Sequence, residues 1–124
     1  MEDRSVPVVI DGKNHELLLT SKAVDVLAKR YGGIENIGDF AQGAGVAEII
    51  FVLTLLANQS TLVYNLRHKD APRELLVEEE VALLTSPFEL AGFKGQIMEA
   101  MTKGMKRNVQ SAPDDDEEKN TQAG

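Results

Sequence analysis

The hydrophobic pattern at the start of the chain predicts a β-hairpin that runs into an amphipathic helix. Residues 8–10 are β-branched and favour a strand, and Asp11-Gly12 suits the positive φ angles of a tight hairpin turn. We expect the return strand over 15–19, where three leucines enter the core. Beyond Thr20 or Ser21, either of which can cap a helix, apolar residues recur at helical spacing until Gly32-Gly33 ends it.

The middle of the chain predicts a short helix, a loop and then a central helix. Residues 34–40 fit a short helix with Ile37 and Phe40 facing inward. Gly38, Gly43 and Gly45 indicate that residues 38–45 form a loop. The run from Val46 to Asn58 is apolar nearly all round, which is typical of a buried central helix.

The second half of the chain predicts three further helices. Ser60 or Thr61 can cap one that extends to Leu66, before a polar turn over 67–72. Three glutamates, 78–80, open the next, where they face the positive end of the helix dipole. Ser-Pro-Phe-Glu at 86–89 is a strong start signal for the last helix, which should fade near 104–108. The predicted fold class is α+β, mainly α: a hairpin followed by about five helices in a small bundle.

Length and charge predict one folded domain with an acidic tail. The chain has 124 residues and a formal charge of -7. Residues 110–124 hold five acids, one lysine and no large apolar side chain, so we expect a disordered tail or linker. The remaining fifteen acids and twelve bases leave residues 1–109, the expected hairpin-plus-helical-bundle domain, with a charge of -3.

Composition excludes several classes of function. The acidic balance and the 5% aromatic content argue against nucleic-acid binding. The apolar run 46–57 is shorter than the roughly 20 residues of a membrane span, and it is interrupted by polar residues, so we expect no membrane partner. The start of the chain lacks the pattern of a signal peptide. Together with the absence of cysteine, these features predict a soluble intracellular protein.

No residue pattern predicts catalysis, a cofactor or a metal. His68 and Asp70 lie two residues apart in a polar turn, which fits solvated surface residues better than a metal site. The glutamates 78–80 diverge around a helix and cannot form an acid–base pair. Gly43-Ala44-Gly45 lacks the lysine and hydroxyl of a phosphate-binding loop. We therefore expect a protein that is not an enzyme and acts by binding.

The last predicted helix carries the candidate binding surface. Met side chains adapt to partners of loosely defined shape, so a Met-rich stripe suits partner binding. The alternative is that the stripe covers the core, and both hold if only the end with Met101 and Met105 projects. If the stripe binds a partner, Met101→Glu would weaken binding and leave the domain folded. The predicted partner-binding residues are Phe93, Ile97, Met98, Met101 and Met105.

Several short motifs resemble the tail assembly chaperones of long-tailed bacteriophages and prophages. They are Ile-Asp-Gly-Lys at 10–13, Leu-Leu-Thr-Ser-Lys-Ala at 18–23, Tyr-Gly-Gly at 31–33 and Glu-Glu-Val-Ala-Leu-Leu at 79–84. A final helix that leads to a loose C-terminus fits the same pattern. The resemblance spans most of residues 6–105, and its motifs serve the fold rather than a chemical site.

This resemblance implies a protein that keeps the tape-measure protein soluble while tail-tube subunits polymerise around it. Such a protein acts in the host cytoplasm, is absent from the mature virion and is often extended by a ribosomal frameshift, for which Lys119-Asn120 could be encoded by slippery codons. The sequence is also compatible with a homo-oligomer. The alternatives are a structural tail component, such as a connector or terminator, and an acidic regulatory adaptor that imitates phosphates.

Overall fold

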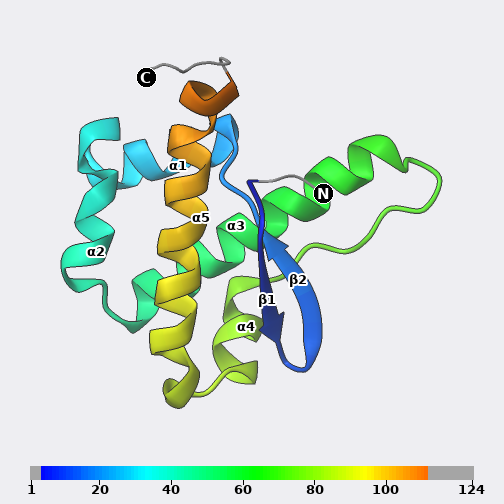
Figure 1. Ribbon diagram of the computed structural model, residues 1–124. Helices are drawn as coiled ribbons and strands as arrows, with labels where there is room; N and C mark the ends of the chain where they lie inside the picture. The colour runs from blue at the N-terminus through cyan, green and yellow to red at the C-terminus, as the bar shows by residue number, and fades with distance from the viewer. Residues whose placement is uncertain (1–3, 112–124) are drawn as a thin grey trace.

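The computed structural model describes residues 4–111, apart from the side chains at 34, 38, 39, 41, 42 and 106–111. The strands and helices follow the expected order, from an N-terminal hairpin to a long last helix (Figure 1). Their bounds are β1 Val6–Ile10, β2 Lys13–Leu17, α1 Ser21–Tyr31, a 3-10 helix Ile34–Asp39, α2 Phe40–Gly43, α3 Val46–Arg67, α4 Glu78–Leu84, a 3-10 turn Pro87–Glu89 and α5 Leu90–Ser111.

The hairpin forms as expected, but its return strand lies two residues earlier. Ile10 pairs with Lys13 across the turn, and Asp11 and Gly12 adopt φ angles of 53° and 74°, as a primed turn requires. The ladder ends at Leu17 because the Leu18 N–H donates instead to the Leu56 carbonyl of α3, at 3.1 Å. This bond joins the hairpin to the central helix.

Helix α1 begins and ends as the sequence predicts. The Thr20 hydroxyl accepts a hydrogen bond from the Ala23 N–H at 3.1 Å, which makes Thr20 the N-cap. The same hydroxyl donates to the Gln59 Oε1 atom of α3 at 2.5 Å. Gly32 ends the helix with a left-handed φ of 87°. The cap therefore also joins α1 to α3.

The central helix α3 corrects the prediction of two helices in this region. It continues without interruption from Val46 to Arg67, through the expected caps at Ser60 and Thr61. The Thr61 hydroxyl donates to the Ala57 carbonyl one turn earlier at 3.5 Å, so it does not cap a new helix. The described residues contain four helices of seven or more residues, and the expected five was slightly high.

Two other expectations differ from the structure. The expected loop 38–45 contains the single helical turn α2, although Ile37 and Phe40 are buried as predicted. Helix α5 extends to Ser111, beyond the expected fading near 104–108. The predicted tail, 110–124, lies outside the described residues from 112 onward.

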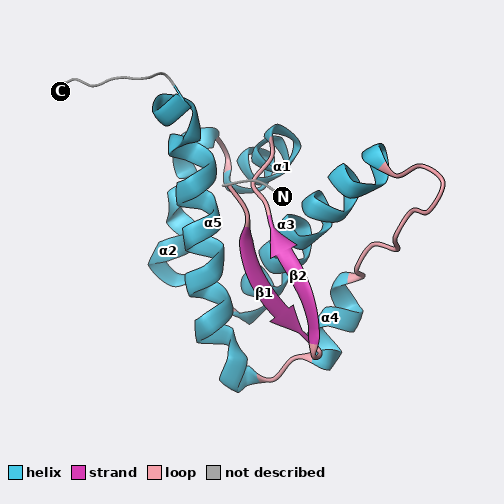
Figure 2. Ribbon diagram, turned by 45° about the vertical axis from the view of Figure 1, so that its right-hand side comes forward, coloured by secondary structure: helices cyan, strands magenta, loops and turns pink. Residues whose placement is uncertain are grey.

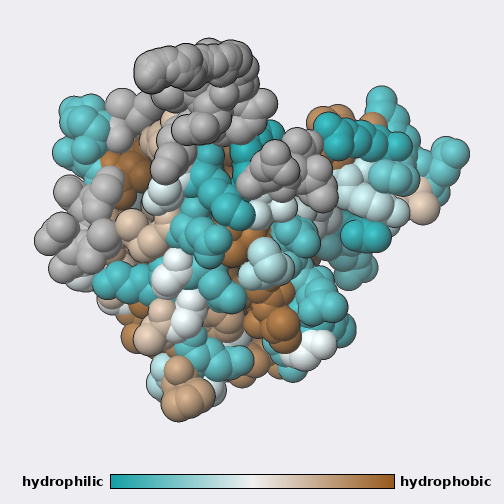
Figure 3. Space-filling model, viewed as in Figure 1, coloured by the Kyte–Doolittle hydropathy of each residue, from teal (hydrophilic) through white to brown (hydrophobic). Residues whose placement is uncertain are grey.

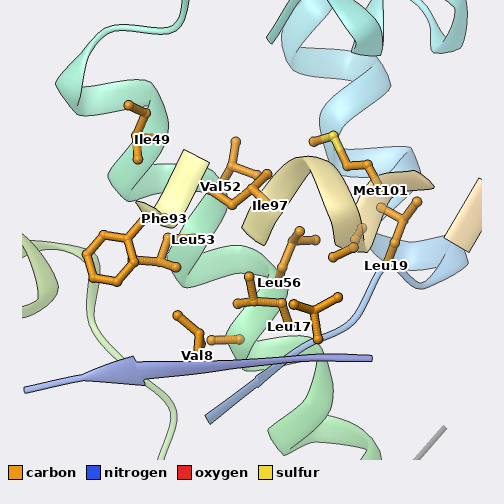
Figure 4. Packing of buried hydrophobic residues seen from close by; sticks show 14 of the residues in the cluster. Val8, Leu17, Leu19, Ile49, Val52, Leu53, Leu56, Phe93, Ile97 and Met101 are labelled. Carbon is orange, nitrogen blue, oxygen red and sulfur yellow. The ribbon is translucent and has the colours of Figure 1, made fainter. Parts of the chain in front are cut away.

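The core lies where the hairpin and α5 pack on α3. Strand β1 lies beside α5 and strand β2 beside α3 (Figure 2). Side chains from the three elements converge in this space, as Figure 4 shows. Those labelled there are Val8, Leu17, Leu19, Ile49, Val52, Leu53, Leu56, Phe93, Ile97 and Met101.

The last turns of α3 project beyond this core and are followed by a non-helical return segment, residues 68–77 (Figure 1). Asn58 and Asn65 hold this segment, since each exchanges two hydrogen bonds with its backbone. The expected turn over 67–72 is therefore longer than predicted, and it begins one residue later.

Candidate partner-binding surfaces

Most of the predicted Met-rich stripe of α5 belongs to the core. Phe93, Ile97 and Met101 are buried, and Met98 is half-buried against the core cluster. Met105 is 46% exposed. The structure therefore favours the alternative in which this face covers the core, and it leaves Met105 as the accessible residue of the stripe.

Large apolar side chains are exposed elsewhere, mainly around α4 and at the end of α3. Figure 3 shows apolar surface among polar surface near the hairpin and α4. Exposed apolar side chains that lie close together are typical of binding surfaces. The exposed large apolar residues are Val9, Val46, Leu66, Leu75, Val77, Leu83, Leu84, Phe88 and Met105.

Phe88 is the most exposed of these residues, at 94%. It sits in the 3-10 turn before α5, and a capping box fixes this turn: Ser86 N–H donates to the Glu89 Oε1 atom at 2.7 Å, while the Ser86 side chain accepts from the Glu89 backbone. Pro87 restricts the turn further. An aromatic side chain on a rigid turn loses little conformational entropy when it binds a partner.

An apolar groove runs along the projecting end of α3. Leu62, Val63 and Leu66 supply its apolar lining, and Leu66 is 71% exposed. Lys22 and Asn65 also line it, and the cavity volume is about 450 Å³. Among the described residues that line the groove, Lys22 alone is charged. We call this site the α3 groove.

A second groove lies between the two helices at the other end of α3. Val46, Ala47 and Ile50 line it from α3, and Glu78, Glu79 and Ala82 line it from α4. The glutamates open α4, as predicted from the sequence. Because they start a helix and are exposed, they interact favourably with the helix dipole and with water.

A polar cluster joins the end of α1 to the start of α3. Arg30 makes a bidentate ion pair with Glu48 at 2.8 and 3.0 Å, and its guanidinium lies 3.9 Å from the Phe51 ring centroid. The Tyr31 hydroxyl donates to Glu48 at 2.9 Å. Hydrogen bonds from Arg30 and Tyr31 lower the pKa of Glu48, while burial and Glu48 raise the pKa of Tyr31 to about 12. These hydrogen bonds and the burial of Tyr31 explain both pKa shifts, and a catalytic role is not needed to explain them.

Among the described residues, neither His15 nor His68 belongs to a group that could hold a metal ion. The His68 ring stacks on Tyr64 with 3.9 Å between centroids, and its Nδ1 atom is 2.9 Å from the Tyr64 carbonyl. Burial, and then Lys13, lower the pKa of His15 on β2. Within residues 4–111, no group of three His, Cys, Asp or Glu residues is placed to bind a metal ion.

Helix α3 is the one helix of the described chain that is long and apolar enough to cross a membrane by length and composition. Its first two-thirds form the centre of the core, where Val52, Leu53 and Leu56 are fully buried. The core helix of a soluble protein satisfies the same criterion.

Sequence reasoning missed the surfaces at Leu66, Leu83 and Phe88. A sequence signal for Leu83 was present, because Val81 and Leu83 are two residues apart and so point to different sides of a short helix. The α3 groove had no local signal, since its lining joins Thr20 and Lys22, at the start of α1, to residues of α3 that are about forty positions further along the chain.

Comparisons with protein-family models, with curated proteins and with solved structures find no match to this chain.

Proposed function

We propose that this protein is a tail assembly chaperone of a long-tailed bacteriophage or prophage. It binds the tape-measure protein, keeps it soluble and helps to recruit tail-tube subunits, without catalysing a reaction. The motifs at 10–13, 18–23, 31–33 and 79–84 support this family. The hairpin, the capped helix α1 and the mainly helical body are consistent with it.

The observation that carries a binding function is the exposure of Phe88 on a fixed turn. A large aromatic residue that is 94% exposed gains little from the fold of its own chain. Burial in a partner would remove its apolar surface from water and contribute about 2 kcal/mol. A tape-measure protein, which presents long apolar helical stripes, is a partner with which Phe88 can pack.

Co-expression with a tape-measure fragment tests this proposal. We expect the wild-type chain to hold the fragment in the soluble fraction and to be recovered with it by affinity purification. Phe88→Ala should reduce recovery about tenfold, as for an aromatic anchor. Val9→Thr is the matched control, because it changes an exposed apolar residue of β1 and keeps the β-branched shape. Met105→Ala, assayed beside them, tests the accessible end of the α5 stripe.

Three further measurements separate this function from its alternatives. The chaperone should be absent from purified virions, and its detection there would favour a structural tail component. A slippery heptamer with an overlapping frame in the coding DNA near codons 115–122 would support a frameshifted longer product. If the tape-measure fragment stays insoluble with the wild-type chain, and deletion of 110–124 abolishes binding to another partner, the acidic adaptor is the better description.

A further inference from the structure

The outer edge of β2 carries backbone groups that have no partner in the two-stranded sheet. In an antiparallel pair, residues alternate between facing the partner strand and facing away from it. Ile10 and Lys13 flank the two-residue turn and bond to each other. Counted from this pair, Asn14 and Glu16 are the residues of β2 whose N–H and carbonyl groups point outward. Among the described residues, no hydrogen bond reaches these four groups.

The two edges of the hairpin differ in what covers them. On β1, Pro7 has no N–H, and its carbonyl accepts a hydrogen bond from the Gln96 side chain of α5 at 3.4 Å. Between Pro7 and the turn, Val9 is then the one outward residue of β1. Beyond the end of β2, the Leu18 N–H donates to the Leu56 carbonyl of α3. The open edge is therefore the stretch of β2 before Leu18, and open strand edges are templates for pairing with another chain.

A polar cleft of about 300 Å³ adjoins this open edge. Residues 14–16 of β2 form one of its walls. Ser60, Thr61 and Tyr64 line it from α3, and Arg73 and Glu74 line it from the return segment. A strand that paired with β2 would therefore run along the mouth of a cleft with room for a side chain.

The alternation along β2 decides which side chain of an added strand would enter the cleft. His15 shares one face of the hairpin with its cross-strand partner Val8, which is buried. Figure 4 shows that Val8 and Leu17 point from this face toward α3. In an antiparallel addition, the residues that bond to Asn14 and Glu16 flank one residue that lies opposite His15, on the same face. The side chain of that residue points toward α3 and the cleft.

Arg73 is the charged group that the structure holds in place beside this cleft. Asn65 bonds to its backbone N–H and carbonyl at 2.8 and 3.0 Å. Its guanidinium carbon lies 3.7 Å from the centroid of the Tyr64 ring. The His68 ring stacks on Tyr64 with 3.9 Å between centroids, so the two groups must lie on opposite faces of that ring. Within the described chain no carboxylate pairs with Arg73, and a stacked guanidinium keeps its edge donors free for a carboxylate.

The other charges around the cleft oppose an incoming carboxylate only weakly. Glu74 is exposed, so water and salt screen its charge. Glu16 pairs with Pro7 across the hairpin, so its side chain leaves from the face opposite to that of His15. Burial, and then Lys13, lower the pKa of His15, which is therefore neutral at pH 7. Arg73 is the group that a carboxylate in the cleft would contact directly.

We propose that β2 accepts an extended peptide of a partner protein as a third, antiparallel strand, with a carboxylate side chain opposite His15 that pairs with Arg73. The peptide backbone exchanges two hydrogen bonds with each of Asn14 and Glu16. These main-chain bonds supply affinity, and the cleft supplies selectivity for the acidic side chain. The inference goes beyond the proposed chaperone function, because the ligand is an extended acidic segment rather than an apolar helical stripe, and Phe88 takes no part.

NMR titration of the full chain with a synthetic strand tests the proposal. The probe is the capped peptide Thr-Val-Thr-Glu-Thr-Val-Thr, whose residues favour an extended backbone. With the probe on the order of 1 mM, a concentration suited to a weak peptide contact, the amide protons of Asn14 and Glu16 should move downfield and exchange more slowly. The Val9 amide, on the other edge, should not change.

Two results of this titration would overturn the proposal. One is an absence of change at the Asn14 and Glu16 amides. The other is protection of these amides from exchange before the probe is added, because the chain's own residues 112–124 or a second copy would then cover the edge.

Probes with methylated amides distinguish strand pairing from other modes of binding. The amides of the two threonines beside the glutamate face β2 in the proposed pairing, so methylation of both should weaken binding by about tenfold or more. The glutamate amide faces away from β2, so its methylation should change binding by less than about twofold. Equal losses from the two kinds of probe would exclude the proposed register.

Substitution of Arg73 tests the contact with the carboxylate. The same peptide with glutamine in place of glutamate should bind the wild type about fivefold more weakly, since it loses a charge-assisted hydrogen bond. Arg73→Gln should remove this preference and keep the fold, because Asn65 holds the backbone of residue 73 and not its side chain. Glu74→Gln is the matched control and should strengthen binding of the glutamate probe about twofold, since it removes a like charge.

A preference for glutamate that persists in Arg73→Gln overturns the role of Arg73, as does a wild type without any preference. Phe88→Ala should bind the probe like the wild type. Strand addition and the proposed chaperone function therefore fail independently.

Discussion

Asn58 of α3 and Leu76 of the return segment are joined by two hydrogen bonds. The Asn58 Nδ2 atom donates to the Leu76 carbonyl at 2.9 Å, and the Leu76 N–H donates to the Asn58 Oδ1 atom at 2.8 Å. Asn65, two turns further along α3, makes the same pair of bonds with Arg73 at 3.0 and 2.8 Å. Each asparagine amide thus bonds to both the N–H and the carbonyl of one residue in the return segment. These backbone groups have no partner in a helix or strand.

Removing these amides should destabilise the protein unequally. Asn58→Ala breaks two partly buried hydrogen bonds and should lower the free energy of unfolding by about 2 kcal/mol. Asn65→Ala breaks two exposed bonds, which water can replace, and should cost about half as much. Urea unfolding of both variants measures the difference. A larger loss for Asn65→Ala would show that this amide has a structural role that the exposed hydrogen bonds do not explain.

Gly104 allows α5 to approach the chain before α1. A Cβ atom at Gly104 would lie 2.7 Å from the Leu19 Cβ atom, whereas one at Gly95 would have no neighbour within 4 Å. Gly104→Ala should therefore destabilise the fold by about 1–3 kcal/mol through overpacking. Gly95→Ala on the same helix should stabilise it by about 0.5–1 kcal/mol, since alanine favours helix. Thermal melts of the two variants should shift in opposite directions, and shifts of the same sign would refute the close approach.

Substitutions at the two methionines nearest the C-terminal end of the predicted stripe should differ sharply in their effect on stability. Met101 is 5% exposed and Met105 is 46% exposed. Met101→Glu buries an unpaired carboxyl group and should cost about 4 kcal/mol, a large part of a typical domain's stability. Met105→Glu should change stability by less than about 0.5 kcal/mol. This result, measured by chemical unfolding, would replace the expectation that Met101→Glu leaves the domain folded.

Stability should fall in acid partly through Glu48. Its pKa is lowered in the folded protein from the ordinary value of 4.5 by the hydrogen bonds from Arg30 and Tyr31. The unfolded chain then binds more protons as the pH falls, so this contribution is present above pH 4.5 and is lost as the pH drops through the folded pKa. Glu48→Gln should flatten the acid limb of a stability–pH curve. An unchanged limb would assign the loss to other carboxyl groups.

Stability should also fall in alkali through Tyr31. Its pKa is raised from 10.0 to about 12 by burial and by the hydrogen bond to Glu48. Between these values the unfolded chain loses its phenolic proton before the folded protein does, so stability is complete below pH 10 and declines toward pH 12. Absorbance titration of the phenolate, with Tyr31→Phe to assign the signal, measures this pKa directly. Titration of Tyr31 near pH 10 in the folded protein would contradict the contact with Glu48.

The sequence predicted those features that depend on neighbouring residues. The turn at Asp11-Gly12, the Thr20 cap, the Gly32 stop and the capping box of Ser86 and Glu89 were all confirmed. Each is a contact within three or four residues of chain. A polar side chain with a free backbone N–H beside it, or a glycine where φ must be positive, leaves few alternatives.

The candidate site could be predicted only in part, because burial depends on residues that are distant along the chain. The stripe from Phe93 to Met105 has the same helical spacing whether it faces a partner or the core. Packing against β1 and α3 decides this, and it leaves Met105 accessible while burying Met101. The exposure of Leu66 likewise depends on how far α3 extends past the hairpin.

The sequence alone therefore determined where most elements begin, and it contains the motifs that resemble those of phage chaperones. Tertiary structure decided that α3 continues through Ser60, because the return segment and the Thr20 cap pair with Asn58, Asn65 and Gln59 along it. It also decided which apolar side chains remain exposed. Caps and turns are set by local backbone geometry, whereas burial is a property of the whole packed chain.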